Sequence, residues 1–198
     1  RHGVEIRAAD VTLSDWDCTM ENGEEGRGAE GHAAVRLGLR MAGGLAGAAG
    51  RRIVENRPYV SVAELARRAG LNPKDLKCLA AAGALQALAG HRRSAHWATS
   101  GVEKGTAFLP PEMRTGDQPE FEPPAEGEEI VADYRSLGFT LGRHPLALLR
   151  GVLSSKRIFS SQDLNQLPHG SRARAAGLVT CRQRPDTASG VVFVTLED

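Results

Sequence analysis

The glycine-rich segment around residue 44 could bind a ligand through its backbone rather than through its side chains. Its sequence, Gly-Gly-Leu-Ala-Gly over residues 43–47, predicts a tight turn that leads into a helix. The first amides of a helix have no internal acceptor and can donate to a phosphate, and small side chains let the phosphate approach. Arg51 and Arg52 follow one turn later and would add positive charge beside it. The turn residues expected to make this contact are Gly44, Leu45, Ala46, Gly47 and Ala48.

The surrounding sequence predicts a helix on each side of this turn. Residues 33–57 are expected to form a helix, the glycine-rich turn and a second helix, which Pro58 ends. Such a helix-hairpin-helix module holds DNA by its phosphates without reading bases. A turn that serves only helix packing remains an alternative. A dinucleotide-binding loop is disfavoured, because the glycines at 44, 47 and 50 are spaced Gly-x-x-Gly-x-x-Gly instead of Gly-x-Gly-x-x-Gly, and no hydrophobic strand precedes them.

The end of the chain carries a second candidate for nucleic-acid contact. Alternating apolar positions predict a strand near residues 173–179 and another over residues 190–196. Basic side chains on a small antiparallel sheet, with an aromatic for base stacking, are typical of a single-strand-binding surface of the OB type. A hairpin whose arginines are merely solvated remains the alternative. The residues expected on this surface are Arg172, Arg174, Arg182, Arg184 and Phe193.

No catalytic or metal-binding constellation is expected in the chain. Asp15 and Asp17 flank Trp16 at a spacing that could serve a metal, but such a pair is more often an exposed strand edge. The acidic residues between positions 112 and 129 lie among prolines, where a two-metal centre would lack rigid support. Three widely spaced cysteines predict reduced thiols and a cytoplasmic protein, rather than a disulfide framework or a zinc site.

Capping signals predict short helices after the hairpin. Ser61 and Glu64 have the form of a capping box, Gly70 supplies a stop, and Pro73 occupies the tolerated first position of the next helix. The expected fold class is mainly α with a small β part. The predicted domains are short strands and a loop at 1–32, a helix-hairpin-helix domain at 33–97, an acidic Pro/Gly-rich linker at 98–127, a helical connector at 128–168, and the strands of an incomplete OB-type β-barrel at 169–198.

Charge is distributed unevenly, although the net charge is only +1. Residues 36–97 carry eleven basic and three acidic side chains, and residues 134–198 carry nine and four. Residues 98–133 between them carry two basic and nine acidic side chains. Two basic blocks favour two modules that face a polyanion, with a solvated surface as the plain alternative. No apolar run approaches the roughly 20 residues that span a bilayer, so no membrane partner is expected.

Segments along nearly the whole chain carry a resemblance to a known family. They are Arg1-His2-Gly3-Val4-Glu5-Ile6-Arg7, Ser14-Asp15-Trp16-Asp17-Cys18-Thr19, Arg36-Leu37-Gly38-Leu39-Arg40, Leu65-Ala66-Arg67-Arg68-Ala69-Gly70-Leu71, Glu128-Glu129-Ile130-Val131-Ala132-Asp133-Tyr134-Arg135-Ser136-Leu137-Gly138, His144-Pro145-Leu146, Arg182-Gln183-Arg184-Pro185 and Val191-Val192-Phe193-Val194-Thr195-Leu196-Glu197-Asp198. The final two are the most specific. In this order they resemble the C-terminal region of bacterial C-family polymerases, DNA polymerase III α-like, and most closely the error-prone, damage-inducible branch. Since the chain starts without Met and stops after an apolar stretch, we expect both ends to be cut from a longer protein.

The resemblance implies a helix-hairpin-helix region that grips duplex DNA and the start of an OB domain near the template strand, in a polymerase that acts in damage-induced mutagenesis and translesion synthesis. The family's catalytic aspartates, with their Mg²⁺, lie in a palm domain upstream, so no cofactor is expected in this chain. The parent would be a DNA-directed nucleotidyltransferase, and the chain alone would be inactive. One departure concerns the hairpin, where Gly43 stands in place of the usual Lys and Ala46 in place of a frequent charged residue.

The partners implied by the resemblance are DNA, bound independently of sequence, together with mutagenesis-complex proteins and a sliding clamp. Two other functions remain open at this point. The chain could be a platform that docks the polymerase onto those protein partners, because short helices and an acidic, Pro-rich spacer can present such contacts. It could also be a free-standing accessory protein of DNA repair.

Overall fold

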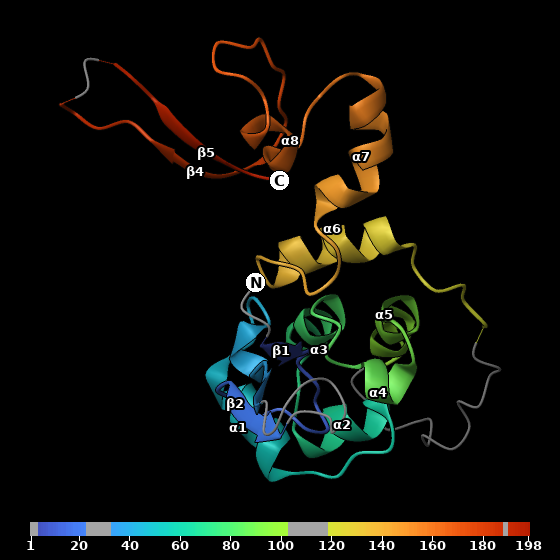
Figure 1. The fold of residues 1–198 in the computed structure, drawn as a ribbon. Coiled ribbons are helices and arrows are strands. Elements are labelled where there is room, and N and C mark those ends of the chain that lie inside the picture. The colour runs from blue at the N-terminus through green and yellow to red at the C-terminus, as the bar shows by residue number, and fades with distance from the viewer. Residues whose placement is uncertain (1–3, 23–32, 103–118, 188–189) are drawn as a thin grey trace. The chain divides into compact units, whose positions relative to one another are not determined.

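The computed structural model describes residues 4–22, 33–102, 119–187 and 190–198 (Figure 1). The chain divides into two compact units, Arg1–Leu141 and Gly142–Asp198. The described part is mainly helical with a small β part, as predicted. The first unit contains β1 (Glu5–Arg7), β2 (Thr19–Asn22), β3 (Ala33–Arg36), the 3₁₀ helix η1 (Leu39–Met41), α1 (Gly47–Glu55), α2 (Val62–Arg68), α3 (Pro73–Ala81), α4 (Gln86–Ala89), α5 (Arg92–Ser100) and α6 (Glu126–Ser136). The second contains α7 (Pro145–Ser155), α8 (Ser161–Asn165), β4 (Leu178–Gln183) and β5 (Phe193–Glu197).

A three-stranded sheet precedes the glycine-rich turn, in the order β1-β3-β2. The central strand β3 pairs in parallel with β1 and antiparallel with β2, so that Val35 lies opposite both Ile6 and Met20. The helix predicted to begin at residue 33 is therefore wrong, because residues 33–36 form this strand and residues 39–41 only one short 3₁₀ turn. Pairing on both edges overrides the helix preference of the alanines. Glu21 on β2 also pairs with the guanidinium of Arg36.

The helices that follow begin and end at the predicted signals. The Ser61 hydroxyl accepts from the amide of Glu64 at 3.2 Å, while the Glu64 carboxylate accepts from the amide of Val60 at 2.9 Å. Asn72 and Asp75 form a reciprocal capping box at the start of α3. These helices bury an aliphatic core in which the largest fully buried apolar side chains are Leu39, Ile53, Leu65, Leu76, Leu79, Leu85 and Val11.

Helix α6 belongs to the first unit, although the sequence indicated a connector separate from the helix-hairpin-helix domain. A buried guanidinium holds it in place. Arg92, 7 % exposed, starts α5 and pairs with Glu129 and, at 2.6 Å, with Asp133 of α6. Asp133 also accepts from the Thr140 hydroxyl at 2.7 Å. Because both carboxylates lie on the inward side of α6, one cation fixes this helix to α5.

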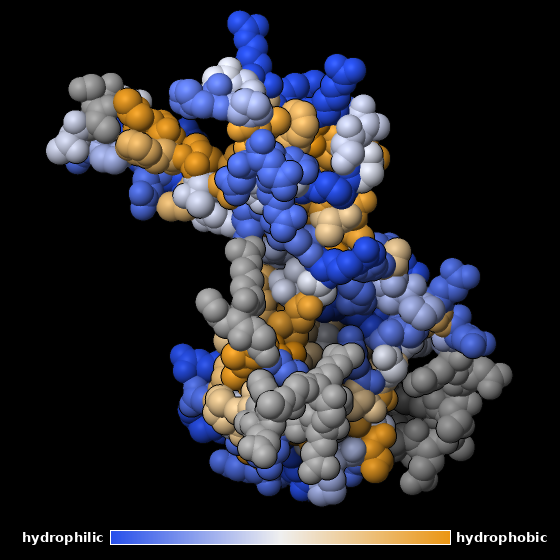
Figure 2. Space-filling view, viewed as in Figure 1, coloured by the Kyte–Doolittle hydropathy of each residue, from blue (hydrophilic) through white to orange (hydrophobic). Residues whose placement is uncertain are grey.

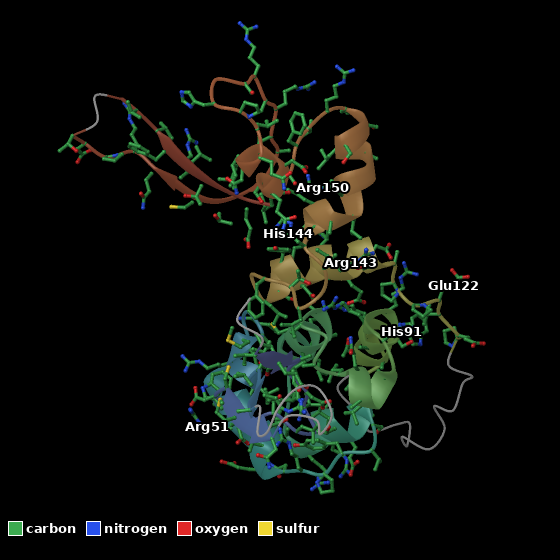
Figure 3. All side chains as sticks on the ribbon, in the orientation of Figure 1. Arg51, His91, Glu122, Arg143, His144 and Arg150 are labelled. Atoms are coloured by element: carbon green, nitrogen blue, oxygen red, sulfur yellow. The ribbon has the colours of Figure 1, made fainter. Side chains whose placement is uncertain are left out.

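The chain that leads into α6 also lies against α5. The backbone carbonyl of Phe121 is 2.9 Å from Nε2 of His91, and the Phe121 ring lies 5.5 Å from the ring of Trp97. Arg93 donates to the carbonyl of Glu122 at 3.1 Å. Figure 3 shows Glu122 beside His91. The segment before α6 is thus held independently of the Arg92 ion pairs.

In the second unit, β4 and β5 form an antiparallel hairpin with an irregularity between Val179 and Cys181. Two strands were predicted here, but the first begins at Leu178 instead of near residue 173. A side chain at Gly177 would lie 2.5 Å from Cβ of Leu196, so a glycine lets the strands meet. Figure 2 shows apolar side chains on the surface of this hairpin. The exposed apolar residues are Val179, Val191, Val192, Phe193, Val194 and Leu196.

We predict that Arg92→Ala lowers the free energy of unfolding by on the order of 3 kcal/mol, because it leaves two carboxylates without their buried partner. Arg93→Ala is the matched control: its ion pair with Glu128 and its hydrogen bond to the carbonyl of Glu122 are both exposed, so its loss should cost about 1 kcal/mol or less. Urea denaturation of the two variants measures the difference. Equal losses would mean that Arg92 does not hold α6.

Candidate nucleic-acid interface

The glycine-rich segment forms a turn followed by a helix, as predicted. After η1, the amide of Leu45 bonds to the carbonyl of Ala42 at 3.2 Å, and Gly44 adopts a φ of 84°. This conformation favours glycine, since it crowds a side chain against the backbone. Helix α1 then begins at Gly47, with Ala46 in extended conformation at its N-cap. Residues 41–49 are therefore a bend and a helix start, not one continuous helix.

The first turn of α1 leaves backbone amides without hydrogen-bond acceptors, and those of Gly47 and Ala48 lie outside the buried core. Ala46 has no side-chain oxygen that could cap the helix, and the first backbone bond runs from the amide of Gly50 to the carbonyl of Ala46 at 3.0 Å. Within the described part of the chain, the amides of Gly47, Ala48 and Ala49 have no hydrogen-bond acceptor. Ala46 and Ala48 are exposed at this end. The arrangement can donate several N–H groups to one anion, at the positive end of a helix dipole.

The five predicted turn residues do not take equal parts in this arrangement. Leu45 is buried in the core and its amide is already bonded, so it anchors the turn. Gly44 faces Cys78 of α3, whose sulfur would be 3.2 Å from a Cβ at that position. Gly47 and Ala48 supply open amides. The contact surface is therefore the start of α1, with the preceding turn as its support.

Trp16 packs onto the same helix and accounts for two of its glycines. A Cβ at Gly50 would lie 2.2 Å from Cε3 of the indole, and one at Gly47 would lie 3.4 Å from Cζ2. The absence of side chains at Gly47 and Gly50 thus leaves space for the Trp16 ring. Sequence reasoning missed this contact. The only signal was the spacing of glycines by three, which places Gly47 and Gly50 on one face of a helix.

The carboxylates beside Trp16 are used in ion pairs. Asp17 pairs with Arg40 at 2.6 Å, and Asp15 lies 3.9 Å from the guanidinium of Arg57. Among the described residues, no three His, Cys, Asp or Glu side chains are grouped as a metal site would require.

Arg51 and Arg52 differ in their contacts. Arg52 donates from Nε to the carbonyl of Ala69 at 2.7 Å and from Nη2 to that of Gly70 at 3.1 Å, which ties α1 to the end of α2. Arg51, labelled in Figure 3, is exposed and has no ion pair or hydrogen bond in the described structure. Its Nη2 lies 3.8 Å from where a Cβ on Gly47 would be. The free guanidinium therefore lies near Gly47, the first residue of α1.

The structure does not gather the candidate residues of the second unit on one surface. Arg172 and Arg174 precede β4 in irregular backbone, and Arg184 follows that strand. Arg182 lies opposite Val194, whereas Phe193 lies opposite Gln183. Because neighbouring positions of a strand face opposite sides, the side chains of Arg182 and Phe193 project from opposite faces of the hairpin. All five residues are exposed, and their contact with DNA stays a prediction.

The glycine-rich turn and α1 lie within the part of the chain that matches a known family model. The family model for the helix-hairpin-helix motif matches residues 3–95. Along its whole length, the chain is 52 % identical to an error-prone DNA polymerase from Alkalilimnicola ehrlichii and 49 % identical to one from Azoarcus sp.. A third error-prone DNA polymerase, from Methylococcus capsulatus, is 42 % identical. The chain spans about one fifth of the length of these curated relatives, 19–20 %. The predicted resemblance to a part of the error-prone DNA polymerases is thereby confirmed.

Within the described residues, no helix is long and apolar enough to cross a membrane.

We predict that Gly50→Ala lowers the free energy of unfolding by about 1–3 kcal/mol, because the new methyl group forces Trp16 out of its position. Gly151→Ala is the matched control. It also lies within a helix, but nothing lies within 4 Å of its added Cβ, so helix propensity should raise stability by up to about 1 kcal/mol. Thermal unfolding, together with tryptophan fluorescence, distinguishes the two; a stabilised Gly50→Ala protein would contradict the packing described.

Proposed function

We propose that the chain is the non-catalytic DNA-binding part of an error-prone DNA polymerase, and that it holds DNA by its phosphates independently of sequence. The observation that carries this proposal is the first turn of α1, where the open amides of Gly47 and Ala48 lie beside the unpaired guanidinium of Arg51. The helix-hairpin-helix match and the error-prone DNA polymerases among its relatives support it. Damage-induced mutagenesis and translesion synthesis in the cytoplasm are the roles we infer for the parent.

The chemistry of nucleotide transfer belongs elsewhere in the parent. We propose that a palm domain outside this chain holds the catalytic aspartates and Mg²⁺, so that the isolated chain binds DNA without extending a primer. The hairpin has Gly43 where a lysine is usual, so binding relies on main-chain donors and on Arg51. Backbone donors of this kind position a duplex but do not select its bases.

A second candidate function is the docking of protein partners such as mutagenesis-complex proteins or a sliding clamp. The specific observation in its favour is the exposed apolar surface of the β4–β5 hairpin, since patches of this kind often mark interaction sites. The two functions use different units of the chain and are separable by mutation.

We predict that duplex binding weakens steeply with salt, because the release of counterions from phosphates drives it. Arg51→Gln should weaken binding and lower the slope of log K against log salt by about 0.9, the value for one phosphate contact. Fluorescence anisotropy between 50 and 200 mM salt, roughly the range over which such contacts are lost, measures both. Scrambling the sequence of the duplex should leave the affinity unchanged.

Arg52→Gln is the matched control for this experiment. It removes the same charge one residue away, but it should act chiefly on folding, with a loss of about 1–3 kcal/mol in the free energy of unfolding from the two hydrogen bonds to Ala69 and Gly70. Absence of binding at low salt, or binding that ignores salt, would rule out the proposed function. Equal binding by wild type and Arg51→Gln would rule out the role of α1.

A further inference from the structure

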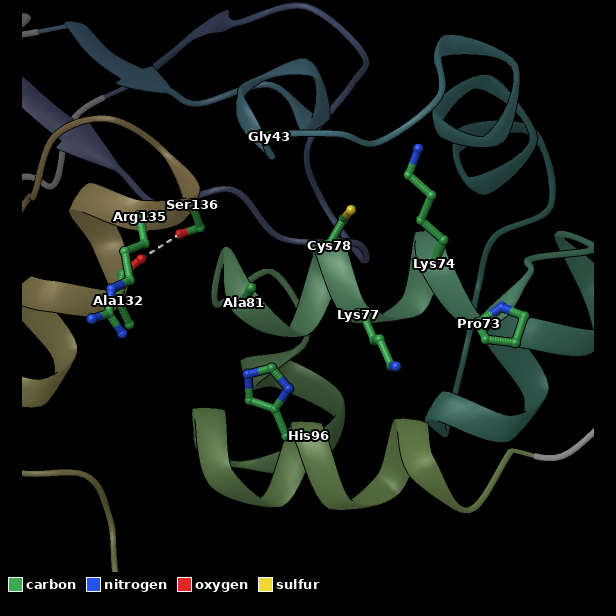
Figure 4. Close-up of a pocket in the computed structure, with 10 residues that line it drawn as sticks. All are labelled: Gly43, Pro73, Lys74, Lys77, Cys78, Ala81, His96, Ala132, Arg135 and Ser136. Carbon is green, nitrogen blue, oxygen red and sulfur yellow. Dashed lines mark hydrogen bonds between the residues drawn. The ribbon is translucent and has the colours of Figure 1, made fainter.

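A second basic site lies in the first unit, at a pocket between α3, α5, α6 and the turn after η1 (Figure 4). The pocket has a volume of about 630 Å³. Its lining residues from α3 are Pro73, Lys74, Lys77, Cys78 and Ala81, and the others are Gly43, His96, Ala132, Arg135 and Ser136. None of these residues is acidic, so the pocket is a hollow with positive charge on its walls.

The cations of this pocket are uncompensated. Lys74, Lys77 and Arg135 have no ion pair or hydrogen bond in the part of the chain that the structure describes. Most other arginines of this unit behave differently, because carboxylates already neutralise them. The paired arginines are Arg7, Arg36, Arg40, Arg57, Arg68, Arg92 and Arg93. Three free cations around one concave surface focus a positive potential and attract an anion.

The remaining lining residues leave room for that anion. Ala81 and Ala132 are small, and Gly43 has no side chain. A Cβ at Gly43 would lie 2.8 Å from the carbonyl oxygen of Ser136, the same oxygen that accepts from the Gly43 amide at 2.9 Å. That bond closes one wall, since it joins the glycine-rich turn to the end of α6.

His96 on α5 adds a polar group to the pocket without adding another positive charge beside the lysines and Arg135. Burial, and then the nearby Arg92, hold the pKa of His96 below its ordinary value. The imidazole is therefore neutral near pH 7 and can offer one N–H to a ligand. Figure 4 shows His96 on α5 and Arg135 on α6 near the pocket, while the side chains of Lys74 and Lys77 leave α3 in opposite directions.

We propose that this pocket binds phosphate groups of a nucleic-acid strand, as a second contact beside the start of α1. The inference rests on the proposed function and deepens it, because it adds a site made of side chains to one made of backbone amides. Gly43 supports a nucleic-acid strand as the ligand, because it lines the pocket and also belongs to the turn that leads into α1. A backbone that lies on the first turn of α1 thus has a neighbouring place for another of its phosphates.

The test uses the full chain and single neutralising variants, Lys77→Gln and Arg135→Gln, with Arg67→Gln as matched control. Arg67 is exposed on α2 and does not line the pocket. We expect each pocket variant to weaken duplex binding by roughly two- to five-fold and to lower the salt slope by about 0.9, with less change in Arg67→Gln. Unchanged thermal unfolding of the variants shows that only binding was altered.

Cys78 provides a second readout, because its thiol lines the pocket and is partly exposed. A bound duplex should slow alkylation of Cys78 several-fold, as located by mass spectrometry, and the double variant Lys77→Gln/Arg135→Gln should abolish this protection. Parallel samples contain inorganic phosphate, a nucleoside triphosphate without metal, or polyglutamate in place of DNA. Protection by either phosphate ligand but not by duplex would assign the site to a free phosphate ligand and overturn the strand assignment; equal protection by polyglutamate would overturn phosphate recognition.

The two proposals fail in different ways. If Arg51→Gln weakens binding while both pocket variants behave like Arg67→Gln and Cys78 stays unprotected, the pocket inference is wrong and the proposed function stands. If the wild-type chain does not bind duplex DNA at low salt, the proposed function is wrong. The proposal that the pocket binds a nucleic-acid strand is then wrong as well.

Discussion

The buried guanidinium of Arg92 is the interaction on which the position of α6 in the first unit depends. A cation so far removed from solvent needs anionic partners, and Glu129 and Asp133 of α6 supply them. This requirement brings α6 against α5, and α6 in turn offers the carbonyl of Ser136 to the amide of Gly43. Helix α6 thus contacts the glycine-rich turn and forms one wall of the basic pocket, although it lies far from the turn in the sequence. Their geometry is therefore a property of the whole unit.

The division of charge within this unit explains how a chain with a net charge of +1 can face a polyanion. Most arginines are neutralised by carboxylates or, like Arg52, satisfied by backbone carbonyls. Arg51, Lys74, Lys77 and Arg135 are not engaged in this way in the described structure. Only a few cations of this unit are thus free to meet an anion, and a count of basic residues would overstate the number available.

Local sequence signals predicted the features that depend on neighbouring residues, such as helix caps and turns. The cap at Ser61, the helix start at Pro73, the turn at Gly44 and the two final strands needed only neighbouring residues. Strand β3, the indole of Trp16 on Gly50 and the docking of α6 depend on partners distant in sequence. One sequence contains no record of such pairings, because each strand or helix can satisfy its own periodicity in several folds. The glycine-rich turn was accordingly predicted, while the different contacts of Arg51 and Arg52 were not.

The contacts of Phe121 with His91 and Trp97 have a consequence for how this region can vary. They hold the chain just before α6 on the same helix, α5, that precedes residues 103–118. Noncovalent contacts, rather than the length of the intervening polypeptide, thus determine where α6 lies. Because these contacts join α5 directly to the chain before α6, they would still act if residues were added between 102 and 119.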